Sequence, residues 1–220
     1  TVFLYLRYGT KRDFELYHED YIKLYVDTVR KSAQDEDSTR PFLVSSPTNG
    51  LQSEKESFVS ENPYSTHFGD VHFYDYDHDM WDHQNYPNPR MCSEYGIQSL
   101  PSVNSFQNQF SDDDLYFESP LLKNRQHHPL GNLQLWNQVF SHFLLPTNME
   151  SKSGFKNFIY LTQVHQAMGI KLQTEAYRRS RSIMTEEGEG LTMGALYWQL
   201  NDLWAAPSWA SIEKLWKCLA

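Results

Sequence analysis

The chain has 220 residues, a formal net charge of −9 and a mean hydropathy of −0.65, and 40% of its residues are apolar. This length suffices for one domain with a sizeable core, since typical domains hold about 100–200 residues. A phosphate-binding surface needs clustered Lys and Arg, so 19 basic against 28 acidic residues argue against a nucleic-acid partner, and no apolar run reaches the roughly 18 residues of a membrane span.

The first predicted element is an amphipathic helix over residues 13–33, where apolar side chains recur at three- and four-residue steps. Residues 41–46 predict a short buried strand, closed by turn residues at 47–50. Two more strands are expected at 70–76 and 90–96.

Residues 101–154 are rich in Asn, Gln, Ser, Asp and Pro, which predicts an elaborated connection with a helix around 133–143. A second helical pattern begins at Phe158 and extends to about Ile183. Residues 192–200 are too apolar for a one-sided strand and suit a strand buried on both faces.

Alternation of buried strands with helices predicts a parallel sheet. A (β/α)₈ barrel (TIM barrel) carries its reactive side chains at the carboxyl ends of its strands. Polar side chains follow the predicted strands here, namely His72, Tyr74 and Asp75, then Ser93, Glu94 and Tyr95, then Gln199, Asn201 and Asp202. A full barrel needs roughly 250 residues. The expected fold class is therefore α/β, a partial barrel holding roughly strands five to eight with their helices.

Four sequence words give a more specific indication. They are Arg40-Pro41-Phe42 with Ser45 to Gly50, Gly69 to Asp75, Arg90 with Ser93-Glu94-Tyr95-Gly96, and Gly194 to Trp204 with Pro207 to Ala210. In this order they resemble the catalytic barrel of glycoside hydrolase family two, in its β-mannosidase branch, over about residues 17–209. The resemblance implies that residues 1–220 are the C-terminal half of that barrel, an apparent fragment truncated at both ends.

The same resemblance implies a retaining hydrolase that uses two glutamates. The family's nucleophile stands in the Ser-Glu-Tyr-Gly word, so the role transfers to Glu94. Such a nucleophile must be an ionised carboxylate about 5–5.5 Å from a general acid. The family places that acid in an Asn-Glu word just before the helix expected at 13–33, but the sequence contains no Asn-Glu pair, and Glu15 and Glu19 fall within the helical pattern. The acid/base and the N-terminal half of the barrel are thus expected to be missing partners of this chain.

Alternative interpretations remain open for the other candidates. Glu94 could instead be a buried carboxylate paired with Arg90. Tyr74 could donate a hydrogen bond to the nucleophile, or be a core tyrosine. His72 could contact a sugar hydroxyl, or bind a backbone carbonyl.

The remaining candidates lie after the last predicted strand. Trp198 could stack on the C–H face of a sugar or simply pack in the core. Trp204 and Trp209 could form a wall of the cleft. Gln199, Asn201 and Asp202 offer groups for hydroxyl recognition, with at least one of them expected to be only a loop cap.

No metal site or cofactor is expected. The histidines between His67 and His83 lack tight ligand spacing, and Cys92 and Cys218 form no Cys-x-x-Cys pattern. His127 and His128 are expected on the surface, and His165 is expected as a core histidine whose nitrogens are hydrogen-bonded.

The function expected on this basis is release of terminal β-D-mannose from oligosaccharides by double displacement. A β-galactosidase or β-glucuronidase relative is one alternative, and a barrel remnant that binds sugar without turnover is another. The resemblance implies a lysosomal location, because animal members of the family are lysosomal.

Overall fold

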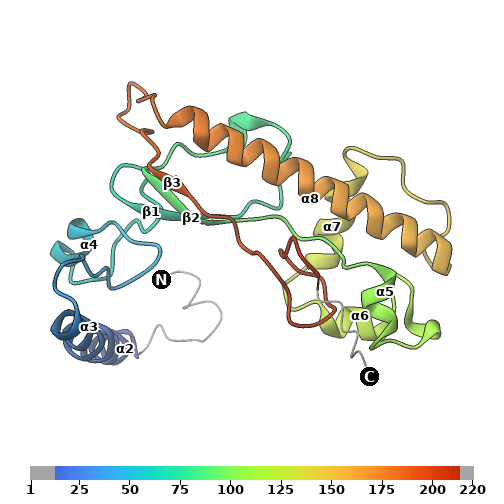
Figure 1. Ribbon diagram of the computed structural model, residues 1–220, viewed down its shortest axis with the longest axis horizontal. Helices are drawn as coiled ribbons and strands as arrows, with labels where there is room; N and C mark the ends of the chain where they lie inside the picture. Colours follow the sequence, from blue (N-terminus) through green and yellow to red (C-terminus); the bar gives the residue numbers. More distant parts are fainter. Residues whose placement is uncertain (1–12, 214–220) are drawn as a thin grey trace.

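The computed structural model describes residues 13–213. Three helical segments follow one another without a break, α2 (Phe14–Tyr21), the π-helix η2 (Ile22–Arg30) and α3 (Lys31–Glu36). Figure 1 shows them as one rod beside the short helix α4 (Leu51–Lys55). The helix predicted over 13–33 is confirmed and extends to Glu36.

The strand predicted at residues 41–46 is wrong. These residues form bends and irregular chain, and the nearest pairing is a single antiparallel bridge between Thr48 and Asp70. Pro41 and Pro47 lie at either end of this segment, and a proline has no N–H to donate to a ladder. The segment nevertheless lies against the sheet, because Thr48 and Asp70 exchange backbone hydrogen bonds of 3.1 and 3.0 Å.

The sheet has three parallel strands in the order β1 (Asp70–Phe73), β2 (Met91–Tyr95) and β3 (Gly194–Ala195). The register of β1 against β2 shifts between Val71 and His72, so that His72 lies opposite Glu94. The strands predicted at 70–76 and 90–96 are confirmed, although both are shorter. Because all three strands are parallel, their carboxyl ends share one edge of the sheet.

The strand predicted at 192–200 is confirmed only at Gly194–Ala195. Beyond it, backbone N–H groups still reach β2, from Leu196 to the carbonyl of Cys92 and from Trp198 to that of Tyr95. Burial on both faces is wrong, however, because the side chains of Leu196 and Trp198 are 58% and 43% exposed.

A short helix, η3 (His83–Asn85), lies between β1 and β2. The elaborated connection expected over residues 101–154 holds several more short helices, namely α5 (Val103–Gln107), η4 (Asp112–Asp114), α6 (Pro120–Arg125) and α7 (Gly131–Phe140). The predicted second long helix is α8 (Lys152–Ser180), which begins earlier than expected because Ser151 caps it by accepting a hydrogen bond from the N–H of Gly154.

Helix α8 joins the two parts of the core. Near its C-terminal end, Tyr177 packs with Val71, Cys92 and Tyr95 of the sheet. Near its N-terminal end, Phe155 and other apolar side chains pack with α5, α6 and α7. Figure 1 shows the sheet and the short helices along the same long helix. The α/β class is therefore confirmed.

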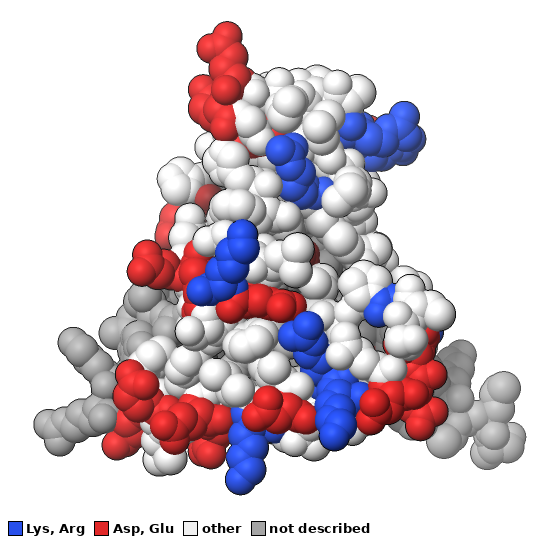
Figure 2. Space-filling model, turned by 90° about the vertical axis from the view of Figure 1, so that its left-hand side faces the viewer, with Lys and Arg blue, Asp and Glu red and all other residues white. Residues whose placement is uncertain are grey.

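The surface agrees with the composition. In the face drawn in Figure 2, Lys and Arg are scattered among Asp and Glu and do not gather into a basic patch. Within residues 13–213, no helix has the length and apolar character needed to cross a bilayer.

Candidate active site

At the carboxyl ends of β1 and β2, Glu94 lies beside His72 of β1 and beside Tyr74, the residue that follows β1. The Tyr74 hydroxyl donates a hydrogen bond of 3.0 Å to Glu94 Oε2, and His72 Nδ1 lies 3.4 Å from the same oxygen. Burial raises the pKa of the Tyr74 phenol, and the negative charge of Glu94 raises it further, so the phenol stays a donor. The Glu94 side chain remains 31% exposed, which leaves it accessible from solution.

The pairing of Glu94 with Arg90 is wrong. The guanidinium of Arg90 donates to the backbone carbonyls of Gly188 and Gly190, at 2.8 and 2.5 Å. It thereby fixes the turn that precedes β3. Within residues 13–213, the carboxylate of Glu94 therefore has no Lys or Arg partner, and the phenol and the imidazole lie against it.

His72 contacts hydroxyl groups on its other side. Its Nε2 lies 2.9 Å from Ser46 Oγ and 3.1 Å from Ser93 Oγ. Both hydroxyls donate to Asp70 Oδ2, over 2.7 and 2.6 Å, and the Ser93 N–H donates to Asp70 Oδ1 over 2.8 Å. The backbone carbonyl expected as a partner of His72 is replaced by this serine pair.

Sequence reasoning missed the roles of Ser46, Asp70 and Ser93, although all three stand inside the words that carry the resemblance. Asp70 is only 8% exposed. A buried carboxylate requires donors, and the pattern of an aspartate two residues before a candidate histidine on the same strand face was the available signal.

An aromatic cluster lies beside Tyr74. The ring of Trp209 stands edge-on to that of Tyr74, with centroids 6.2 Å apart, and its Nε1–H donates to Tyr76 Oη over 2.9 Å. The His128 ring lies 4.4 Å from that of Tyr76. Burial raises the pKa of Tyr76 to about 12. His127 is exposed, as expected, whereas His128 is half-buried in this cluster. His127, His128 and Trp209 line a cavity of about 590 Å³.

Trp198 lies directly beside the strand that carries Glu94. Its backbone carbonyl packs on Gly96, where an added Cβ would meet that oxygen at 2.2 Å, and its indole is 43% exposed. Trp204 is 50% exposed, and the Arg125 guanidinium lies over its ring, 4.7 Å from the centroid.

The other three candidates interact mainly within their own loop. Asp202 Oδ1 accepts a hydrogen bond of 2.6 Å from Ser208, while Gln199 Nε2 approaches it at 3.5 Å and Asn201 Nδ2 donates to its carbonyl at 3.3 Å. Burial raises the pKa of Asp202, and the bond from Ser208 opposes that effect. Within the described chain, none of the three forms a hydrogen bond to Glu94.

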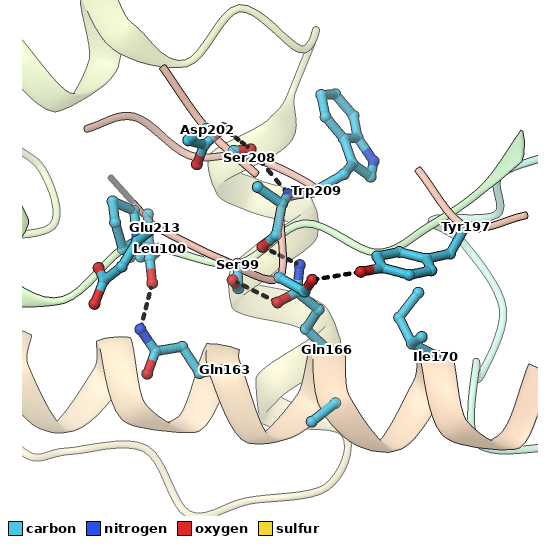
Figure 3. A pocket seen from close by; sticks show the side chains of 14 residues that line it. Ser99, Leu100, Gln163, Gln166, Ile170, Tyr197, Asp202, Ser208, Trp209 and Glu213 are labelled. Carbon is cyan, nitrogen blue, oxygen red and sulfur yellow. Dashed lines mark hydrogen bonds between the residues drawn. The ribbon is translucent and has the colours of Figure 1, made fainter. Parts of the chain in front are cut away.

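Asp202 instead lines a second cavity, of about 490 Å³, between α8 and the last described loop. Figure 3 shows Asp202 beside Ser208, with Gln163 and Gln166 of α8 on the opposite wall. Gln166 closes the bottom of the cavity, because its Nε2 donates to the carbonyl of Ile97 over 2.8 Å and its Oε1 accepts from Ser99 over 3.0 Å.

The next feature is the placement of the possible metal-binding side chains and of the two cysteines. Among residues 13–213, no group of three or more His, Cys, Asp or Glu side chains is placed to hold a metal ion. Cys92 is buried, which raises the pKa of its thiol to about 11, and Cys218 lies outside the described residues.

The expectation for His165 is half right. The ring is 1% exposed, as a core histidine should be, but neither of its nitrogens has a hydrogen-bond partner. It lies instead in an aromatic stack with Trp81 and His142, at centroid distances of 5.9 and 5.7 Å.

Comparison with known proteins confirms the resemblance to β-mannosidases. The chain is 50% identical to β-mannosidase of Rattus norvegicus over 210 residues, and 46% identical to that of Capra hircus over 215 residues. It is 30% identical over 233 residues to β-mannosidase A of Aspergillus niger. No family model matches the chain.

The fold gives the same result. The chain is similar to the crystal structure of the β-D-mannosidase of Dictyoglomus thermophilum, with a TM-score of 0.68 and 25% identity over 86% of this chain and 21% of that one. The match to the rat protein covers 94% of this chain but only 24% of the rat protein. The chain therefore spans about a quarter of the length of the relatives it matches.

Proposed function

We propose that this chain is the nucleophile-bearing part of a retaining β-mannosidase, with Glu94 as the nucleophile. The observation that carries the proposal is the environment of Glu94, a partly exposed carboxylate at the carboxyl end of a parallel strand that accepts a hydrogen bond from Tyr74. The similarity to β-mannosidases over 94% of the chain supports the choice of substrate, an oligosaccharide with a terminal β-mannose.

The proposed reaction has two steps, in which a glycosyl ester forms on the Glu94 carboxylate and is then hydrolysed. Glu94 attacks the anomeric carbon, a glycosidic C–O bond breaks, and a glycosyl ester forms on Oε1 or Oε2. Water then attacks the same carbon and releases the carboxylate. A fixed donor such as Tyr74 stabilises Glu94 in the ionised form that begins and ends this cycle.

The second carboxylate comes, in this proposal, from outside the chain. The sequence has no Asn-Glu pair, and Glu15 and Glu19 lie on α2, where both side chains are exposed. The three strands then belong to a (β/α)₈ barrel, to which residues 1–220 contribute the C-terminal half. The first half of that barrel supplies the acid/base.

Substrate contacts follow from the same arrangement. Trp198 is half exposed beside the strand that carries Glu94 and offers an aromatic face for a sugar ring. Trp209, with Tyr74 and Tyr76, forms an aromatic wall at the same edge of the sheet. Trp204 and the polar groups of Gln199, Asn201 and Asp202 contribute more indirectly, by shaping the loop.

The test uses the longer protein to which this segment is proposed to belong. It is expected to hydrolyse p-nitrophenyl β-D-mannoside, and Glu94→Gln is expected to lower kcat by several orders of magnitude. Reaction with a 2-deoxy-2-fluoro-β-mannosyl fluoride, which traps glycosyl esters, followed by peptide mass spectrometry should place the label on Glu94. A label on another residue would contradict the proposal.

Two control measurements separate the alternatives. Hydrolysis of the β-galactoside or β-glucuronide in preference to the β-mannoside would indicate the other branches of the family. Saturable mannose binding without turnover would indicate a sugar-binding remnant, the alternative favoured by the missing Asn-Glu word. A lysosomal location is part of the proposal on the strength of the family resemblance, and imaging of the tagged protein against a lysosomal marker would test it.

A further inference from the structure

The hydrogen atoms around His72 can be assigned by counting donors and acceptors. Ser46 and Ser93 each carry one hydroxyl hydrogen, and both hydroxyls lie within 2.7 Å of Asp70 Oδ2. An ionised carboxylate only accepts hydrogen bonds, so both hydrogens point to Asp70. The two serine oxygens therefore present lone pairs to His72 Nε2, which lies 2.9 and 3.1 Å away. His72 must be the donor there, with its proton on Nε2.

The other ring nitrogen faces a second acceptor. His72 Nδ1 lies 3.4 Å from Glu94 Oε2, the oxygen that also accepts the bond from Tyr74. Because the serine pair holds Nε2, the Nδ1 edge of the ring stays beside this carboxylate.

Acidic side chains lie on both sides of the ring. On one side is Asp70, whose Oδ2 lies 3.9 Å from Nε2, and on the other is Glu94. Within the described chain, no Lys or Arg forms an ion pair with either carboxylate. The third titratable neighbour is Tyr74, whose phenol stays protonated as a donor to Glu94.

We propose that Asp70, acting through Ser46 and Ser93, is a positioning residue that fixes the His72 ring against Glu94 and thereby fixes the position of the nucleophile. This inference rests on the proposed function. It replaces a sugar-contacting role for His72 by a role toward Glu94. It also explains why a carboxylate that is only 8% exposed is retained beneath the active site with three donors bound to it.

The experiment uses Asp70→Asn in the longer protein, with an aryl β-mannoside as substrate. The amide can donate to the serines, which frees a hydroxyl hydrogen to point at Nε2 and so weakens the contacts that fix the His72 ring. We expect kcat/KM to fall about tenfold or more, because a hydrogen bond to a charged group is worth a factor of that order.

The same Asp70 substitution in a second variant, Glu94→Ala, distinguishes a positioning role of Asp70 from a merely structural one. In Glu94→Ala, azide can take the place of the missing carboxylate, forming a bond to the anomeric carbon as the aryloxide leaves with its electron pair. The azide-rescued rate no longer depends on the position of a carboxylate at residue 94, because this variant has none. Asp70→Asn should therefore leave that rate within about twofold. Asp113→Asn, on the exposed helix η4, is the matched control and should change neither rate.

The outcomes are separable. Equal losses in both backgrounds, or no loss in either, would overturn the inference. If Asp70→Asn does not fold, the Ser46→Ala, Ser93→Ala double variant tests the same link and should show the same split, with partial recovery in Ser46→Ala alone. An inactive wild-type protein, or an active Glu94→Ala without azide, would instead overturn the proposed function and this inference with it.

Discussion

The indole of Trp209 stands edge-on to the phenol of Tyr74, with ring centroids 6.2 Å apart and the ring planes at 75°. This contact joins the loop after β3 to the end of β1, two segments more than 130 positions apart in the chain. Because the same phenol donates to Glu94, the position of the loop and that of the proposed nucleophile depend on each other. Changes on either side of this contact should therefore affect activity.

Removal of the Tyr74 hydroxyl should weaken catalysis without unfolding the protein. Tyr74→Phe keeps the ring that packs on Trp209 and deletes the 3.0 Å bond to Glu94 Oε2. A hydrogen bond to a charged group is worth about 1.5–3 kcal/mol, so kcat/KM should fall roughly ten- to hundredfold. Steady-state kinetics on an aryl β-mannoside would measure the loss. Tyr160→Phe, on the exposed side of α8, is the matched control, and an equal loss there would refute the assignment.

A methyl group at Gly96 should disturb the packing of Trp198 and Trp209 against the segment that follows β2. An added Cβ would lie 2.2 Å from the Trp198 carbonyl oxygen and 3.1 Å from Trp209 Cδ1, so the backbone after β3 must move. Overpacking of this kind costs about 1–3 kcal/mol, and we expect Gly96→Ala to lower both the melting temperature and kcat/KM. At Gly194 the same methyl would meet only Met91, at 3.8 Å. Gly194→Ala should be nearly neutral, and equal effects at the two sites would contradict this explanation.

The sequence predicted the contact between Tyr74 and Glu94 better than the groups that surround it. Glu94 and Tyr74 stand in words whose order indicated the family, and the parallel register then brings them together. Ser46 could not be placed, because it reaches His72 from a segment without regular structure, where no periodicity indicates which way a side chain points.

The error over residues 192–200 has a different physical cause from the error over residues 41–46. The apolar run at 192–200 predicts a doubly buried strand, yet Leu196 and Trp198 are exposed in the described chain. Hydrophobicity indicates that a residue is buried against something, but it does not say whether the covering surface lies in the same segment. In the proposed barrel, that surface belongs to the missing half.

His165 should make stability depend on pH. Burial, and then the nearby His142, lower its pKa from 6.5 to about 4, an effect that Asp79 partly opposes. Between pH 6.5 and about pH 4, His165 is protonated in the unfolded chain and neutral in the folded chain. The free energy of unfolding is therefore highest above pH 6.5 and declines as the pH falls toward 4.

The test is His165→Phe, which keeps an aromatic ring against Trp81 and removes both unpartnered nitrogens. The variant should show a smaller loss of stability between pH 7 and pH 4.5 than the wild type. At pH 7 it should be at least as stable, because buried nitrogens without partners are costly. Denaturant unfolding at several pH values measures both quantities. A pH dependence identical to that of the wild type would show that His165 does not titrate in this way.

The chain expressed alone should associate. In the described chain the sheet has only three strands. The outer edge of β3 has no partner strand, and that of β1 carries only the single bridge between Thr48 and Asp70. Large apolar side chains after β3 are also exposed, with Leu196 at 58% and Leu203 at 77%. Unpaired edges and contiguous apolar surface favour self-association. Size-exclusion chromatography with light scattering should therefore show oligomers or aggregates at micromolar concentration. Leu196→Lys with Leu203→Lys should reduce the association, whereas Lys171→Gln on α8, which removes only an exposed charge, should not. A monodisperse monomer that unfolds cooperatively would mean that this surface needs no covering, which would remove the physical argument for a missing half of the barrel.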